Sequence, residues 1–195
     1  HDLAETCENN LQIDKELYTT HKVYRGLRDL NGVGVIAGLT KISTVTATKE
    51  VDGKRIPCDG KLFYRGIDVE DLCQGFLKEN RMGFEEATYL LLFGSLPTPE
   101  QLATFNKLLA KNRTLPKNFV RDVIMKASNK DMMNTLSRGI LTLASYDRYA
   151  DNTDIENVLR QSIMLISVIP MLAVYSYHSY NHYHNNPSLY IHRPK

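Results

Sequence analysis

The sequence predicts a mainly α-helical domain with one small β-hairpin, and three observations lead to this prediction. Apolar residues recur at helical spacing over most of the chain after Gly66. Capping sequences mark two helix starts, at Thr98 and at Thr153. β-Branched residues are concentrated between Thr40 and Thr48, close to turn-forming Asp-Gly pairs.

The composition is that of an ordinary globular protein. The chain has 195 residues, of which 43% are hydrophobic and 24% charged, and its formal net charge is +2. This slight basic excess predicts neither nucleic-acid binding nor attachment to an anionic membrane. The longest apolar stretch, 163–177, is shorter than a bilayer span and contains Pro170, so we expect a buried helix.

The cysteines indicate the compartment. Cys7, Cys58 and Cys73 are widely spaced and form no CxxC pair, which argues against a disulfide framework or a zinc ribbon. No secretion signal is recognisable, and the first residue, His1, indicates that the native start lies elsewhere. We therefore expect free thiols and a cytoplasmic protein.

The β-hairpin is expected within residues 39–65. The β-branched run predicts the first strand, and Leu62–Tyr64 predicts the returning strand. Asp52-Gly53 and Asp59-Gly60 both suit tight turns with positive φ. A surface helix is expected before the hairpin, over residues 3–18.

Two helices are expected directly after the hairpin. Asp68 is placed to cap a short helix that carries Leu72 and Phe76. The run from Phe84 to Phe93 is apolar on almost every side, which predicts burial all round. Gly94 is placed to end this run in the left-handed conformation.

Two further helices follow. Thr98, Pro99 and Gln101 form a capping box with proline in the first turn, and the helix should bury Leu102, Phe105 and Leu109. Pro116 is expected to open the next helix, with one face turned inward: Phe119, Val123 and Ala127.

The last helices are the most apolar. One is defined by Met133, Leu136, Ile140 and Leu143. The other should begin at a capping box, Thr153-Asp154-Ile155-Glu156, and carry Leu159, Ile163 and Ile166. We expect Pro170 to kink or end it, and the polar residues 181–195 to form a loop.

Side chains that could carry chemistry are few. His178, His182 and His184 form an HxxxHxH set that could bind a metal, but no acid or cysteine lies nearby, and a solvated helix end is the favoured interpretation. Acids at two helix starts could transfer protons, but complementing the helix dipole is the simpler role: Asp68, Glu70, Asp71, Glu85 and Glu86. The glycine-rich stretch 32–38 lacks the GxGxxG spacing. We predict no catalytic residue and no metal ligand from these patterns.

Several blocks, in order, resemble the opening of the citrate synthases. The longest, from Phe84 to Thr98, is similar to the family's FEEVAYLLLFGELPT segment. The others are Gly26-Leu27-Arg28-Asp29, Gly38-Leu39-Thr40 and the stretch from Asp59 to Gly66. The similarity extends from about Tyr24 to the end of the chain.

This resemblance implies an all-α enzyme that condenses acetyl-coenzyme A with oxaloacetate. It implies that residues 1–195 are the amino-terminal part of the large domain, without the small domain. The family's catalytic histidines and aspartate belong to later segments, and its GPxHG and HxxGGN motifs do not occur here. We therefore expect no catalytic residue in this chain, no citrate formation by it alone and no permanently bound cofactor, with acetyl-coenzyme A as co-substrate.

The resemblance also implies a site residue and a partner. Arg28 matches an arginine that contacts a coenzyme A phosphate in some members, although Asp29 stands where those members have glycine; a surface arginine is the alternative. Arg65 is expected to have a structural role.

The segments 130–147 and 154–179 match helices of the family's homodimer interface, and the core of a monomer is the alternative. A 2-methylcitrate synthase that uses propionyl-coenzyme A and a non-catalytic helical association module remain alternative functions.

Overall fold

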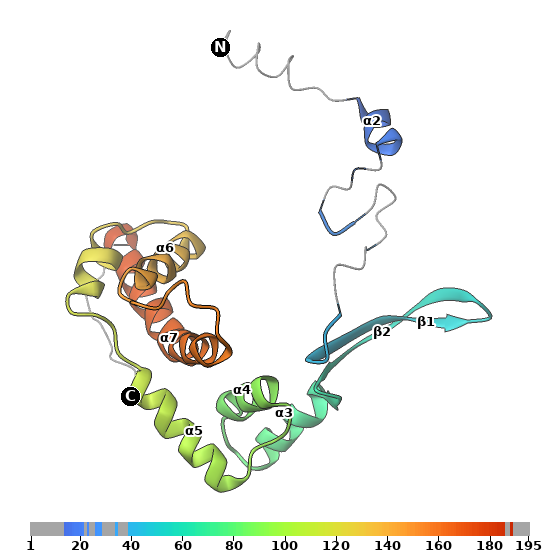
Figure 1. Cartoon of the computed structure of the whole chain (residues 1–195), viewed down its shortest axis with the longest axis horizontal. Helices are drawn as coiled ribbons and strands as arrows, with labels where there is room; N and C mark the ends of the chain where they lie inside the picture. Colours follow the sequence, from blue (N-terminus) through green and yellow to red (C-terminus); the bar gives the residue numbers. More distant parts are fainter. Residues whose placement is uncertain are drawn as a thin grey trace. The chain divides into compact units, whose positions relative to one another are not determined.

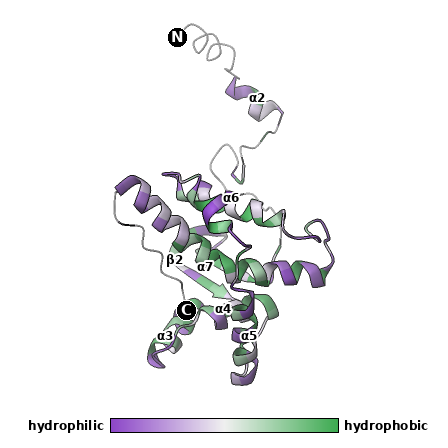
Figure 2. Cartoon of the chain, turned by 90° about the vertical axis from the view of Figure 1, so that its left-hand side faces the viewer, coloured by the Kyte–Doolittle hydropathy of each residue, from purple (hydrophilic) through white to green (hydrophobic). Residues whose placement is uncertain are grey.

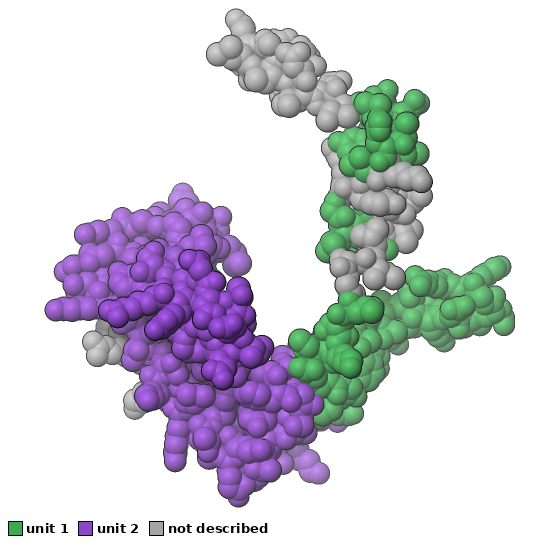
Figure 3. Space-filling view, viewed as in Figure 1, with its two compact units in different colours: residues 1–71 green, residues 72–195 purple. Residues whose placement is uncertain are grey.

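The computed structural model describes residues 14–21, 23, 26–28, 34, 39–185 and 188. The chain divides into two compact units, residues 1–71 and 72–195, and each is described by itself (Figure 3). The mainly helical fold with a small antiparallel sheet is confirmed. Of the helix predicted over residues 3–18, only the end can be assessed, where α2 spans Lys15–Thr20.

The first unit contains a three-stranded antiparallel sheet. Strands β1 (Ser43–Val51), β2 (Lys54–Tyr64) and β3 (Ile67–Asp68) lie in the order β1-β2-β3 (Figure 1). Asp52 and Gly53 join β1 to β2 with φ values of 50° and 71°. Because both central residues have positive φ, this turn matches the twist of the strands, and the first predicted turn is confirmed.

The second predicted turn is wrong. Neither Asp59 nor Gly60 has positive φ, and both lie inside β2. The register changes here: Thr46 pairs with Lys61 and Thr48 with Pro57. A β-bulge therefore accommodates the extra residues of β2, so the chain needs no second turn.

The capping predictions are confirmed for three helices. The Asp68 carboxylate accepts a hydrogen bond from the Glu70 amide (2.9 Å) at the start of α3 (Val69–Lys78). Gly94, with φ of 90°, ends α4 (Phe84–Phe93). Thr98 and Gln101 form both hydrogen bonds of the capping box that opens α5 (Pro99–Asn112).

The helix predicted after Pro116 is a short π-helical segment, η1 (Val120–Met125). Ile124 points into the core instead of Ala127, which is exposed, because the wider π turn rotates the later residues away from the expected face. In α6 (Met132–Ala144), Leu143 is buried as predicted, but Met133 is 70% exposed.

Helix α7 spans Ile155–Asn185 and continues through Pro170. The helix therefore includes residues 181–185, which we expected to be loop. It also begins one residue later than a cap at Thr153 would place it. The first helical hydrogen bond runs from the Val158 amide to the Asp154 carbonyl (2.9 Å), which places Asp154, not Thr153, at the N-cap.

Two apolar clusters form the core of the second unit. One joins α5 to the first half of α7 through Phe105, Leu109 and Ile163. The other joins η1, α6 and α7, and its buried members are Phe119, Ile124, Leu143, Val168, Leu172 and Tyr175. By length and composition α7 could cross a membrane; 28% of its most apolar window is buried in the structure, and Ile163, Val168 and Leu172 pack into these clusters (Figure 2).

The prediction of burial all round for α4 is wrong. Leu90 is its only fully buried residue, while Phe84 is 54% and Phe93 is 44% exposed. α4 contacts α5, and Tyr89 and Leu92 pack against the cluster that α5 forms with α7. The apolar surface of α4 therefore exceeds what this unit covers.

Candidate functional site

Arg28 lies in a short exposed turn of the first unit. Gly26 has a φ of 81°, a conformation that glycine adopts without strain, and an isolated antiparallel bridge pairs Arg28 with Gly34. Leu27 and Arg28 are both exposed. The role of Arg28 in binding coenzyme A stays a prediction.

The acids at the start of α3 are used in structural contacts. Lys61 Nζ lies 3.3 Å from an Asp68 oxygen and 3.1 Å from a Glu70 oxygen. Hydrogen bonding to the Glu70 amide and to Lys61 lowers the pKa of Asp68. Asp68 caps the helix, in line with the favoured interpretation, and Asp68 and Glu70 in addition pair with Lys61.

Arg81 holds the connection between α3 and α4. Its guanidinium pairs with Glu79 and with Glu86 and lies 4.9 Å from the centre of the Phe76 ring. Both ion pairs raise the pKa of Arg81, with the hydrogen bond to Glu86 as the largest cause. Glu86 thus has a structural partner in the described chain.

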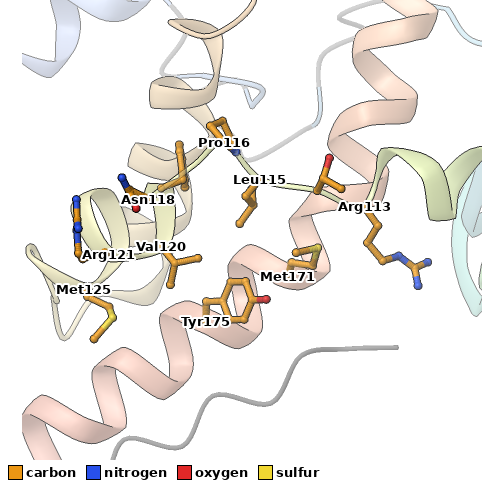
Figure 4. Close-up of a pocket in the computed structure, with 11 residues that line it drawn as sticks. Arg113, Leu115, Pro116, Asn118, Val120, Arg121, Met125, Met171 and Tyr175 are labelled. Carbon is orange, nitrogen blue, oxygen red and sulfur yellow. The ribbon is translucent and has the colours of Figure 1, made fainter.

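The largest cavity described lies between η1 and α7 and has a volume of about 570 Å³ (Figure 4). Leu115, Val120, Met171 and Tyr175 line its centre, whereas Arg113 and Arg121 lie at opposite ends. None of the lining residues is an aspartate, glutamate, histidine or cysteine. The cavity can receive an apolar group, but its walls offer no acid–base pair for catalysis.

The arginine at one end of this cavity already has a partner. Arg121 makes two hydrogen bonds to Asp122, at 2.9 and 2.8 Å, and Lys126 Nζ lies 3.0 Å from the same carboxylate. These contacts hold the pKa of Asp122 far below its usual range. Arg121 is therefore a poor ligand for a second anion.

A polar network fixes the connection between α6 and α7. Arg160 Nη2 lies 2.6 and 2.9 Å from the two oxygens of Asp147, and Gln161 donates a third hydrogen bond to this carboxylate (3.1 Å). The Tyr149 amide adds a fourth (3.0 Å). Arg160, followed by this amide, lowers the pKa of Asp147. Sequence analysis did not identify this network, because its members are separated by a loop.

Asp147→Asn should lower the free energy of unfolding by about 1–2 kcal/mol at pH 7, because the amide cannot accept all of these charge-assisted hydrogen bonds. The pKa of Asp147 is lowered in the folded state. Its contribution is therefore complete above its unfolded pKa, about 3.9, and is lost as the pH falls through the folded value. When urea unfolding is measured from pH 7 to pH 3, the free energies of unfolding of wild type and variant should converge. A difference in free energy that does not change with pH would exclude this ionic role. The exposed Asp151→Asn is the control.

The three histidines lie near the end of α7, among aromatic rings. Tyr177 and His178 have ring centroids 5.8 Å apart, and Tyr180 and His184 have centroids 5.0 Å apart. Within the described residues, no group of three or more histidine, cysteine or acidic side chains could hold a metal ion.

Comparison with known proteins places these features in a family. The family model described as "Citrate synthase, C-terminal domain" matches residues 30–193. The chain belongs to the citrate synthase family. Citrate synthases and 2-methylcitrate synthases are both among its relatives, so membership of the family does not decide between their substrates.

The relatives are considerably longer than this chain. 2-Methylcitrate synthase 2 of Corynebacterium glutamicum is 30% identical over 79% of this chain and 35% of its own length. The citrate synthase of the same organism is 30% identical over 69% of this chain and 29% of its own length. The citrate synthase of Haloferax volcanii is 36% identical over 49% of this chain and 24% of its own length. The chain thus spans about a third or less of these relatives.

Solved structures confirm the fold. Citrate synthase from Pyrobaculum aerophilum matches 89% of this chain and 41% of its own chain, with a TM-score of 0.64 and 22% identity. Citrate synthase from Thermoplasma acidophilum matches 87% of this chain and 38% of its own chain, with a TM-score of 0.62 and 19% identity. The latter structure is a ternary complex with carboxymethyl coenzyme A and oxaloacetate. At these identities the likeness establishes the citrate synthase fold.

Proposed function

We propose that this chain is the amino-terminal part of the large domain of a citrate synthase that condenses acetyl-coenzyme A with oxaloacetate. The observation that carries the proposal is the family match across residues 30–193, on a chain whose fold matches that of citrate synthases. A related enzyme binds a coenzyme A analogue together with oxaloacetate. No cofactor beyond these substrates is proposed.

The 195-residue chain alone is proposed to be inactive. The main cavity lacks the acid and base needed to remove a proton from the acetyl group, and the family's histidine motifs do not occur in the sequence. Release of free coenzyme A, with and without oxaloacetate, tests this directly. Oxaloacetate-dependent release by the purified chain would disprove it.

Which acyl-coenzyme A the enzyme uses can be tested on the longer polypeptide of which this chain is proposed to be a part. A citrate synthase should show a higher kcat/KM with acetyl-coenzyme A than with propionyl-coenzyme A. The reverse preference would favour a 2-methylcitrate synthase. This enzyme is the second candidate, because 2-methylcitrate synthases are about as similar to this chain in sequence as citrate synthases are. Absence of both activities would favour a non-catalytic association module.

Arg28→Ala in that longer polypeptide should raise the KM for acetyl-coenzyme A several-fold, because a guanidinium that pairs with a phosphate is lost. The KM for oxaloacetate should change little. Arg55→Ala, at an exposed position of β2, is the matched control. An unchanged KM for acetyl-coenzyme A would remove Arg28 from the binding site.

We also propose a homodimer through the segments 130–147 and 154–179. The supporting observation is apolar surface on α6 and α7 that this chain leaves open, with Leu141 72% and Ile155 80% exposed. Interfaces of obligate dimers are rich in such side chains. Sedimentation at micromolar concentration should show a dimer or a larger species.

We propose a cytoplasmic location. The free thiols Cys58 and Cys73 support it, and imaging of a tagged protein would test it.

A further inference from the structure

An apolar groove lies between α4 and α7 in the second unit and has a volume of about 480 Å³. It is open to solvent, since Phe84 is 54% and Ile169 is 37% exposed. Residues at helical spacing form both walls: Phe84, Thr88 and Leu91 on α4, and Ile166, Ile169 and Pro170 on α7.

The groove offers no charge to an occupant. All of its lining residues are uncharged, and Thr88 is the only polar one among them. The Thr88 hydroxyl donates a hydrogen bond to the Phe84 carbonyl (2.7 Å), so its hydrogen is already used. Recognition must therefore depend on apolar surface and shape, which excludes an anionic group such as a phosphate as the occupant.

We propose that a helix from the part of the polypeptide that follows residue 195 fills this groove with its apolar face. This inference rests on the proposed function, according to which the chain is the amino-terminal part of a longer citrate synthase. The chain covers 38% and 41% of the two solved citrate synthases, so most of each of those chains lies outside the match. The missing segments are thus long enough to supply further helices to the same domain.

The shape of the groove favours a helix. Two helices that present parallel rows of apolar side chains leave a hollow between them, and the side-chain ridge of a third helix packs into such a hollow. Exposed apolar surface of this kind marks a place where another element packs.

A second copy of the chain is the alternative occupant. The wall that α4 supplies lies outside the segments 130–147 and 154–179, through which the homodimer is proposed to form. That dimer therefore leaves half of the groove without a partner, whereas a downstream helix can contact both walls.

Thiol labelling at residue 169 tests the proposal. With every native cysteine changed to serine, Ile169→Cys should react freely with an aromatic disulfide reagent in the 195-residue chain. In the longer polypeptide the same thiol should react at least about tenfold more slowly, because a covered side chain reacts only when the structure opens locally. Lys107→Cys, at an exposed position of α5, is the control and should react equally fast in both proteins.

Equal labelling rates at residue 169 in the two proteins would overturn the proposal. Slow labelling in the 195-residue chain would overturn it too: a second copy fills the groove if dilution restores the reaction, and a segment within the chain or a bound apolar molecule closes it if dilution does not. Citrate formation by the longer polypeptide is measured separately. An active enzyme with a reactive thiol at residue 169 would refute this inference alone, and an inactive one with slow labelling would refute only the proposed function.

A charge placed in the groove gives a second test that needs only the longer polypeptide. Ile169→Asp should lower the midpoint of thermal unfolding by at least about 5 °C more than Leu77→Asp does, because a carboxylate covered by an apolar helix loses its water without gaining a partner. Leu77 is 79% exposed and lies on α3, outside the groove. Equal shifts for the two variants would contradict the proposal.

Discussion

Phe119→Ala should lower the free energy of unfolding of the second unit by about 3–5 kcal/mol. Phe119 is 1% exposed and belongs to the cluster that joins η1, α6 and α7. Its ring also lies 6.0 Å from that of Tyr146. Alanine leaves a void between these elements that their backbones cannot close, and both the buried area and the ring contact are lost.

Chemical denaturation monitored by circular dichroism measures this effect. Leu77→Ala serves as the control, because Leu77 is 79% exposed and lies outside the proposed dimer segments, so its truncation should change stability by less than about 0.5 kcal/mol. A loss at Phe119 no larger than that at Leu77 would show that this cluster does not hold the unit together.

Gly83→Ala should lower the free energy of unfolding by about 1–3 kcal/mol. A Cβ atom at Gly83 would lie 2.1 Å from two carbons of the Phe76 ring and 2.5 Å from a third. The ring must therefore move, and with it the Arg81 guanidinium that stacks on it and pairs with Glu86. Thermal unfolding of the variant measures the cost.

Gly75→Ala is the matched control for this substitution. Gly75 lies within α3, and a Cβ atom there would meet no atom within 4 Å. Alanine favours a helix over glycine, so this variant should be more stable by about 0.5–1 kcal/mol. If both alanine variants shift stability in the same direction, the clash with Phe76 is not the cause.

Local chemistry made part of the fold predictable. The capping box at Thr98 and the left-handed end at Gly94 were predicted correctly, because each depends on a few neighbouring residues. Asp59-Gly60 shows the limit of such signals. The same pair suits a turn or a bulge, and the pairing of β2 with β1 decides between them.

Burial was harder to predict than helix position. The apolar run of α4 and Met133 on α6 were expected inside, yet Phe84 and Met133 are exposed. Periodicity shows which residues could be buried, but it does not show how much of a face a neighbouring helix covers.

The order of the sequence blocks made the family recognisable. The network around Asp147 and Arg160 was not recognisable, since it forms only when the loop between α6 and α7 folds back.

Pro170 lies inside the part of α7 that packs with η1 and α6. Val168 comes before Pro170, Leu172 and Tyr175 come after it, and all three are buried in the same cluster. Proline supplies no amide hydrogen, so the Ile166 carbonyl loses the partner that it would have four residues later. Because one cluster holds the helix on both sides of this gap, amide hydrogen exchange should show slowly exchanging protons before and after Pro170 with similar rates.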